Sequence, residues 1–222
     1  MKTVIYYFSG TGNSLAAAKR LAQGLEGAVD LLPMVGWEKA QRVAFDGDLL
    51  GLVFPVYFLT VPDVVRSFLR KLVFQSDPYI FAVATCNAQP GHSLYSLKRL
   101  LGRKGQPLAA GFAIDMPGNA VIGKVDRTNP PEVQEARLAN AVPKLAQIVR
   151  SVRERQDGVL EGCNAATMHI QSSLMNGFMK YLYRPSRRFR VLGYCSHCGV
   201  CARICPSRNI KIGVAEKTHK PL

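Results

Sequence analysis

Short apolar strands that alternate with amphipathic helices constrain this chain more than any other feature. Thr3–Phe8 is a β-branched and aromatic run that ends in a glycine-rich turn, so it predicts a buried strand, and Ser14–Leu25 has the apolar spacing of a helix. Further strands are predicted at Val29–Leu32, Leu49–Phe54, Tyr79–Thr85 and Ala109–Asp115, and further helices at Val61–Leu72, His92–Gly102 and Pro131–Arg155. Such alternation predicts a doubly wound α/β domain over residues 1–157, with a five-stranded parallel sheet covered by helices on both faces.

Composition narrows the class of protein and its compartment. Of the 222 residues 48% are hydrophobic, which excludes global disorder and allows one domain with a small appendage. The longest nearly apolar run, Leu49–Leu59, has 11 residues, whereas a membrane span needs about 20. No signal peptide pattern follows Met1, so we expect a cytoplasmic protein with reduced thiols. Clustered cysteines then indicate metal or redox chemistry rather than disulfides.

A glycine-rich loop, Ser9–Ser14, separates the first strand from the first helix, where a doubly wound sheet offers N–H groups to an anion. The loop lacks the lysine of a P-loop, and Leu15 stands where a dinucleotide fingerprint has its third glycine, although Asp30 keeps that alternative open. An ordinary turn, capped by Asn13 or Ser14, is a second alternative. The loop carries hydroxyls and an amide without a cation, which suits a phosphate monoester: Ser9, Thr11, Asn13 and Ser14.

Phe8–Ser14 resembles the FMN phosphate loop of flavodoxins, in the variant typical of flavodoxin–ferredoxin fusion proteins. The resemblance implies a flavodoxin-like fold that binds FMN. It also implies that the phosphate is held by the loop itself: Ser9, Gly10, Thr11, Gly12, Asn13 and Ser14.

Two further loops follow the third and fourth strands, where the flavin ring of such a protein would lie. Tyr57 or Phe58 is positioned to stack on the ring, and Thr85–Gly91 is short and polar, as a loop around the flavin edge should be. The cofactor contacts expected here are Pro55, Tyr57, Phe58, Thr85, Cys86, Asn87 and Gly91. Cys86 has the alternative role of a small packing residue. Asp115–Asn119 resembles another family segment near the site.

Four cysteines near the end of the chain match the bacterial ferredoxin run C-x2-C-x2-C-x3-C-P without deviation. Three thiolates two residues apart can wrap one cluster, and Gly199 allows backbone N–H groups to approach its sulfides. We therefore predict a 4Fe–4S cluster with the ligands Cys195, Cys198, Cys201 and Cys205. Tetrahedral zinc is the rival, but zinc sites usually separate two cysteine pairs by a dozen or more residues.

The ferredoxin pattern is incomplete in this chain. In two-cluster ferredoxins the fourth cysteine of one run serves the other cluster, yet no second run occurs in the 17 residues after Cys205. We expect residues 193–222 to be the first half of a ferredoxin-like segment, cut from a longer chain, and the fourth ligand stays open. Residues 158–192 are expected to form a helix, Met168–Tyr183, and a linker; a basic helix on a membrane surface is the alternative.

Charge and cofactors together give the functional hypothesis. The chain carries a net charge of +14, and residues 176–222 contribute +9 of it. We predict an electron-transfer flavoprotein in which FMN exchanges one or two electrons and a 4Fe–4S cluster exchanges one. Its partner would be a redox protein or a small electron donor or acceptor, with no nucleic acid and no membrane span. The alternatives are a zinc-stabilised module that binds nucleic acid and a flavin-dependent reductase of a small substrate.

Overall fold

The computed structural model describes residues 1–37, 39–122, 125–163, 166–182, 195–212 and 219–221. Its main sheet has five parallel strands: β1 (Thr3–Tyr7), β2 (Val29–Pro33), β4 (Leu49–Pro55), β6 (Tyr79–Cys86) and β7 (Ala110–Asp115). They lie in the order β2-β1-β4-β6-β7. If the five strands of this sheet are numbered by their order along the chain, the order is 2-1-3-4-5, which is the flavodoxin-like doubly wound order. The predicted fold class of the body is therefore confirmed.

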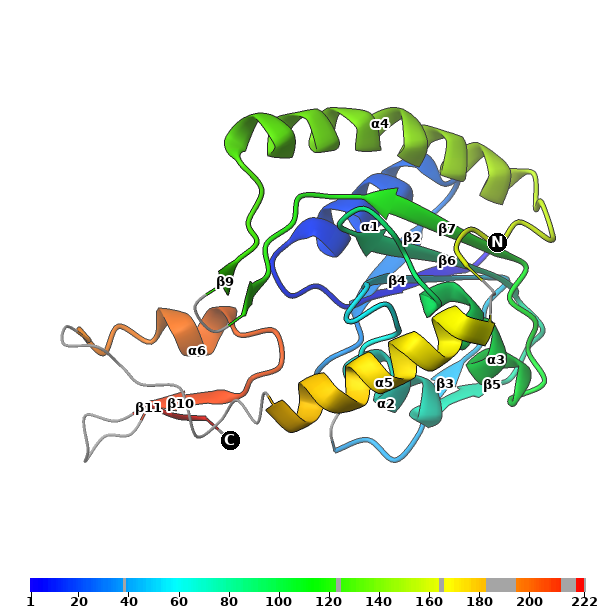
Figure 1. Ribbon diagram of the computed structural model, residues 1–222. Helices are drawn as coiled ribbons and strands as arrows, with labels where there is room; N and C mark the ends of the chain where they lie inside the picture. Colours follow the sequence, from blue (N-terminus) through cyan, green and yellow to red (C-terminus); the bar gives the residue numbers. More distant parts are fainter. Residues whose placement is uncertain (38, 123–124, 164–165, 183–194, 213–218, 222) are drawn as a thin grey trace.

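Helices cover both faces of the sheet (Figure 1). On one face α1 (Asn13–Gly24) and α4 (Pro131–Arg153) enclose an apolar cluster that includes Leu21, Phe81 and Ile148. On the other face α2 (Asp63–Lys71) and α3 (Ser93–Gly102) enclose a second cluster around Leu52 and Phe54. The two clusters explain why the central strands read as continuous apolar runs, because parallel strands are buried on both sides.

Gly51 in the middle of β4 shows how tightly one face is packed. A Cβ on Gly51 would lie 2.7 Å from the Phe81 ring and 2.9 Å from the Ile5 side chain. Both neighbours are fully buried. The glycine therefore leaves room for a large aromatic side chain from the neighbouring strand β6.

Several short elements were not predicted. β3 (Val43–Phe45) and β5 (Leu72–Phe74) form a separate parallel pair, and β8 (Val121–Ile122) and β9 (Val125–Asp126) form an antiparallel pair. Their two or three residues are too few to show a periodicity. After Asp157 the chain remains on the body: Gly111 N–H donates to the Val159 carbonyl (2.7 Å), and the Glu161 carboxylate accepts the N–H of Ala113 (2.7 Å).

The C-terminal part consists of small elements. α5 (Ala166–Leu182) crosses in front of α2 and α3 (Figure 1) and exposes an apolar stripe of Ile170, Leu174, Phe178 and Tyr181. The short helix α6 (Val200–Ile204) is followed by the antiparallel pair β10 (Ile210–Ile212) and β11 (His219–Pro221). Among the helices that the structure describes, none is long and apolar enough to cross a bilayer.

Candidate functional site

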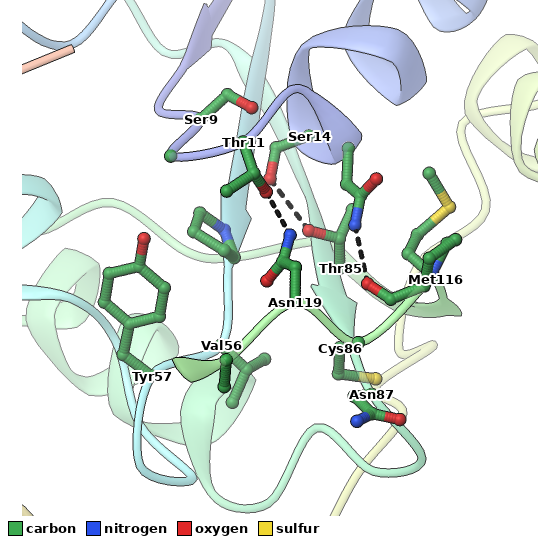
Figure 2. A pocket seen from close by; sticks show the side chains of 16 residues that line it. Ser9, Thr11, Ser14, Val56, Tyr57, Thr85, Cys86, Asn87, Met116 and Asn119 are labelled. Atoms are coloured by element: carbon green, nitrogen blue, oxygen red, sulfur yellow. Dashed lines mark hydrogen bonds between the residues drawn. The ribbon is translucent and has the colours of Figure 1, made fainter. Parts of the chain in front are cut away.

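A cavity of about 580 Å³ opens at the carboxyl edge of the sheet, beside the point where the strand order reverses (Figure 2). The loops after β1, β4, β6 and β7 all reach it. Ten of the residues that were expected to contact a cofactor line it: Ser9, Gly10, Thr11, Asn13, Ser14, Pro55, Tyr57, Thr85, Cys86 and Asn87. Val56 and residues 116–120 complete the lining. Doubly wound sheets bind their ligands at this position.

The glycine loop presents an uncapped helix N-terminus to the cavity. Gly12 is the N-cap of α1, in a left-handed conformation (φ 107°), and no side chain caps the helix. The alternative of a turn capped by Asn13 or Ser14 is therefore wrong. Asn13 Nδ2 instead donates to the Pro117 carbonyl (2.9 Å), and Ser14 Oγ bonds Thr85 Oγ1 (2.8 Å). The first backbone N–H groups of α1, which have no partner within a helix, are thus directed toward the site.

Hydrogen bonds tie the loops of the cavity to one another (Figure 2). The Ser14–Thr85 bond joins the glycine loop to β6, and Asn119 Nδ2 donates to Thr11 Oγ1 from the opposite wall. Ser9 Oγ accepts the N–H of Gly12 at 3.1 Å. The polar groups of the glycine loop are therefore already oriented by the protein.

A tight hairpin forms the second wall. Tyr57 and Thr60 exchange two backbone hydrogen bonds (3.1 and 3.0 Å), and the residues between them, Phe58 (φ 49°) and Leu59 (φ 62°), are both left-handed. Left-handed conformations at both central positions define a type I′ turn. Non-glycine residues in these positions are strained, and such strain gathers at functional sites.

Tyr57 reaches from this hairpin across to the glycine loop. Its ring is 43% exposed, and a Cβ on Gly10 would lie only 2.6 Å from its hydroxyl. Partial burial raises the pKa of the phenol above its usual value. Tyr57 thus places a neutral aromatic ring beside the glycine loop.

Three residues expected to contact a cofactor do not line the cavity: Gly12, Phe58 and Gly91. Gly12 acts as the N-cap of α1, and Phe58 lies on the hairpin turn. Gly91 is buried with φ 56°, and a Cβ there would lie 2.6 Å from the Leu59 side chain. Its role in this structure is to let the loop after β6 pack against the hairpin.

The far edge of the cavity holds a polar cluster that the sequence did not reveal. Arg137, from α4, donates to Asn87 Oδ1 and to the Met116 carbonyl (3.1 Å), and its guanidinium lies 3.8 Å from Asp115 Oδ1. Asp115 also accepts the N–H of Ala88 at 2.6 Å. Arg137 therefore fixes the loops after β6 and β7 from a distant helix.

Cys86 lies on the floor of the cavity and is 8% exposed. Burial, and next the nearby charge of Asp115, raise the pKa of its thiol to about 12. The thiol is thus neutral at physiological pH and is a poor nucleophile. These properties agree with the alternative of a packing residue that also forms part of the cavity floor.

The four clustered cysteines surround α6 but do not converge. In the described part of the chain, no group of three or more His, Cys, Asp or Glu side chains is arranged to hold a metal ion. Local donors nevertheless point at the sulfurs. The N–H groups of His197 and Asn209 lie 3.4 Å from the sulfurs of Cys195 and Cys205, respectively. Thiols with N–H donors around them match the needs of an iron–sulfur cluster, whose properties depend on such hydrogen bonds.

Hydrogen-bond donors near the cysteines also lower the pKa of two thiols. The backbone N–H of Val200, and next the Ser196 hydroxyl, lower the pKa of Cys198. For Cys205 partial burial raises the pKa, but hydrogen bonds from Ser207 and from the N–H of Asn209 outweigh it and leave a net decrease. The thiolate, the form that ligates metals, is therefore favoured at Cys198 and Cys205.

The cysteine segment lies beside the glycine loop. A cavity of about 890 Å³ is lined on one side by residues 9–12 and by Pro33 and Val35, and on the other by Ile204 and Pro206. Ile204 and Pro206 flank Cys205 directly. The loop of the first cavity and the cysteine run thus face a common space.

Known proteins resemble this chain in fold only. Neither a protein-family model nor a curated protein matches the sequence. An azoreductase from Bacillus anthracis is 12% identical with a TM-score of 0.45, covering 68% of this chain and 100% of its own. A flavodoxin from the domain Archaea is 13% identical (TM-score 0.41; 68% and 99%), and the Megasphaera elsdenii flavodoxin is 21% identical (TM-score 0.39; 63% and 97%). The strand order of the sheet, described above, carries the fold assignment.

Proposed function

We propose that the chain is an electron-transfer flavoprotein, with a 4Fe–4S cluster on the cysteine run. FMN would bind in the cavity at the carboxyl edge of the sheet, hereafter the loop cavity. The observation that carries the proposal is the uncapped N-terminus of α1, which meets a cation-free hydroxyl loop and a neutral tyrosine in one cavity. When bound, FMN would exchange one or two electrons and the cluster one, so that the chain would connect two-electron and one-electron carriers.

The phosphate end of FMN would lie on the glycine loop. The N–H groups of residues 13–15 and the hydroxyls of Ser9, Thr11 and Ser14 supply donors, and the dipole of α1 favours a dianion. The Asn119–Thr11 bond crosses this space. Asn119 would turn aside as the phosphate becomes the new partner of Thr11.

The ring would lie between the hairpin and the loop after β6. Tyr57 offers an aromatic face, and Val56 offers an apolar one. Asn87 is held by Arg137 and offers an amide to the polar edge of the ring. The buried Cys86 thiol keeps its proton and closes the floor to water.

The cluster would be held by Cys195, Cys198, Cys201 and Cys205. Two-cluster ferredoxins use the cysteine at the position of Cys205 for their other cluster. The short loop with left-handed His197 (φ 55°) and Gly199 (φ 77°) would let N–H groups face the sulfides. Its place beside residues 9–12 supports electron exchange within one chain.

Anaerobic reconstitution with iron, sulfide and FMN tests the proposal. We expect flavin absorption bands on top of broad iron–sulfur absorption, with all three components retained after gel filtration. Flavin without iron and sulfide would reject the coupling but keep the flavin role. Bound zinc with salt-dependent affinity for nucleic acid would favour the binding-module alternative.

A matched pair of variants locates the FMN phosphate. Thr11→Val removes a hydroxyl that lines the cavity, whereas Thr128→Val removes an exposed one elsewhere. Because hydrogen bonds to charged groups contribute about 1.5–3 kcal/mol, we expect Thr11→Val to weaken FMN binding by roughly tenfold or more. Thr128→Val should bind as the unmodified chain does, and equal affinities in both variants would place the phosphate elsewhere.

A further inference from the structure

A second polar cavity lies between α2, α3 and α5, and it shares no lining residue with the loop cavity. Its volume is about 540 Å³. Figure 1 shows α5 lying alongside α2 and α3. Three arginines line it, Arg66, Arg99 and Arg103, together with Thr60, Ser96 and Asn176.

The charged residues that line this cavity are all positive. All of its lining residues are described, and none of them is an aspartate or a glutamate. Arginine cannot relieve repulsion by losing its proton, because its guanidinium stays charged in proteins. Guanidinium groups that line one cavity therefore repel one another, and an anion between them would relieve this repulsion.

The dipole of α3 explains part of the cluster but not all of it. Arg99 lies in the last turn of α3 and Arg103 is its C-cap, where cations are favourable without any ligand. Arg66 belongs to α2 and does not share this explanation. Its partly buried side chain reaches the same cavity from the other wall.

Arg66 is held in a fixed orientation. Its Nη2 donates to Thr60 Oγ1 (2.8 Å) and its Nε to the Val61 carbonyl (3.1 Å). Desolvation lowers its pKa below the usual value, and the nearby charge of Asp63 offsets this decrease only in part. An anion in the cavity would offset the remainder.

We propose that this cavity binds the phosphate group of a small organic phosphate, such as a nucleotide. A phosphate dianion has three terminal oxygens, which match three guanidinium groups and the hydroxyls of Thr60 and Ser96. A carboxylate would use only one bidentate arginine. The amide of Asn176 adds a donor on the α5 side.

The site is linked to the loop cavity through Thr60. This residue accepts the Arg66 hydrogen bond and also pairs with Tyr57 in the hairpin. A ligand that accepts hydrogen bonds from Arg66 would weaken the bond from Arg66 to Thr60. It would thereby affect the hairpin that carries Tyr57. This link, unlike the phosphate site itself, rests on the proposed binding of FMN.

Calorimetric titration of the full chain with inorganic pyrophosphate, AMP and adenosine tests the site. Arg99→Gln/Arg103→Gln removes two cavity arginines, and Arg42→Gln/Arg150→Gln removes two exposed arginines elsewhere. We expect the cavity variant to lose at least about tenfold in affinity for pyrophosphate and AMP. The control should keep its affinity, and adenosine should not bind.

Equal affinities in the two double variants, whether both unchanged or both weakened alike, would overturn the proposal, because only general charge would then matter. The titrations are done with and without one equivalent of FMN, since the glycine loop also accepts phosphate. A larger amount is avoided because FMN is itself an organic phosphate and would compete for the arginine cavity. If FMN does not bind, the proposed function fails while the FMN-free titrations still report on the arginine cavity.

The link to Tyr57 has its own measurement. FMN affinity is determined with and without pyrophosphate in the unmodified chain, in Thr60→Val and in Arg99→Gln/Arg103→Gln. Pyrophosphate competes with FMN at the glycine loop to the same extent in all three proteins. An effect that passes through Thr60 is therefore measured as the difference between them in how far pyrophosphate changes the FMN affinity. We expect an additional shift of about fivefold or more in the unmodified chain only. The same response in all three proteins would overturn the link.

Discussion

The loop cavity and the cysteine run are built in different ways. In the cavity, hydrogen bonds join the glycine loop and the start of α1 to β6 and to the loop after β7 across more than seventy positions of sequence, as in the Ser14–Thr85 pair. In the cysteine run the hydrogen bonds to sulfur are local, such as that from Asn209 to Cys205. The apolar side chains of α6 are also open to solvent, with Ile204 72% exposed.

The difference shows what each region needs in order to form. The sheet brings the cavity loops together whether or not a ligand is bound, because the strands are fixed by two buried clusters. The cysteine segment has no such core over residues 195–211, where no side chain is buried. Small metal-binding segments of this kind take much of their folding free energy from the metal. We therefore expect cluster and segment to assemble together.

The largest expected effect is a complete loss of the cluster from the cysteine run that leaves the loop cavity unchanged. Cys198→Ser removes a predicted ligand, and because iron–sulfur clusters need their thiolates we expect iron and sulfide content after reconstitution to fall to background. FMN content should stay unchanged, since the cavity forms without the tail. Cys163→Ser, outside the run, serves as the control and should retain the cluster. Loss of FMN in Cys198→Ser would show that the two regions do not form independently.

Thiol reactivity should differ by a smaller but still large factor. In the metal-free chain, alkylation of Cys86 should be at least about a hundredfold slower than that of the exposed Cys198, because a thiol with a pKa of about 12 has only about one thiolate in 10,000 at pH 8. The rate at Cys86 should rise about tenfold per pH unit up to that pKa. Mass spectrometry of labelled peptides measures both rates, and comparable rates at pH 8 would mean that the cavity floor is open.

The main features of the fold could be predicted because parallel strands leave a plain signal. β4 is buried on both faces, so its sequence is an unbroken apolar run, and helices α1, α2 and α3 each separate two strands of the sheet along the chain. The β3–β5 pair and the pairing of residues 158–161 with β7 could not be predicted. Such short pairings depend on which segments the finished sheet brings together.

The residues of the candidate site likewise differ in whether the sequence could predict them. Its glycine loop and Tyr57 were predicted because they follow strands, whose carboxyl ends share one edge of the sheet. Arg137 was missed because it lies in the middle of a charged helix, where an arginine is usually a solvated residue. Only the packing of α4 against α1 and β7 brings it to Asn87 and Asp115. No local pattern in the sequence marks such a residue.

Stability should respond unequally to changes in the two regions. Gly51→Ala forces a methyl group against Phe81 and Ile5 in the middle of the sheet, and overpacking of this kind costs about 1–3 kcal/mol. Ile204→Ala, on the exposed α6, should change the free energy of unfolding of the metal-free chain by less than about 0.5 kcal/mol. Urea unfolding of both variants measures this. A larger loss in Ile204→Ala would mean that the cysteine segment is packed onto the body without a cluster.

The smallest expected effect concerns the contact between Gly10 and Tyr57 at the edge of the loop cavity. Gly10→Ala places a methyl group 2.6 Å from the Tyr57 hydroxyl, and because that hydroxyl ends a partly exposed side chain, the ring can turn aside at little cost in stability. If Tyr57 stacks on FMN, its displacement should weaken FMN binding several-fold while the free energy of unfolding changes by less than about 1 kcal/mol. Gly102→Ala, whose added methyl meets nothing within 4 Å, is the matched control. Adding Tyr57→Phe to Gly10→Ala removes the clashing oxygen but keeps the ring, so it should restore most of the affinity. Failure of this rescue would place the flavin away from Tyr57 and leave the glycine loop as the part of the cavity that holds it.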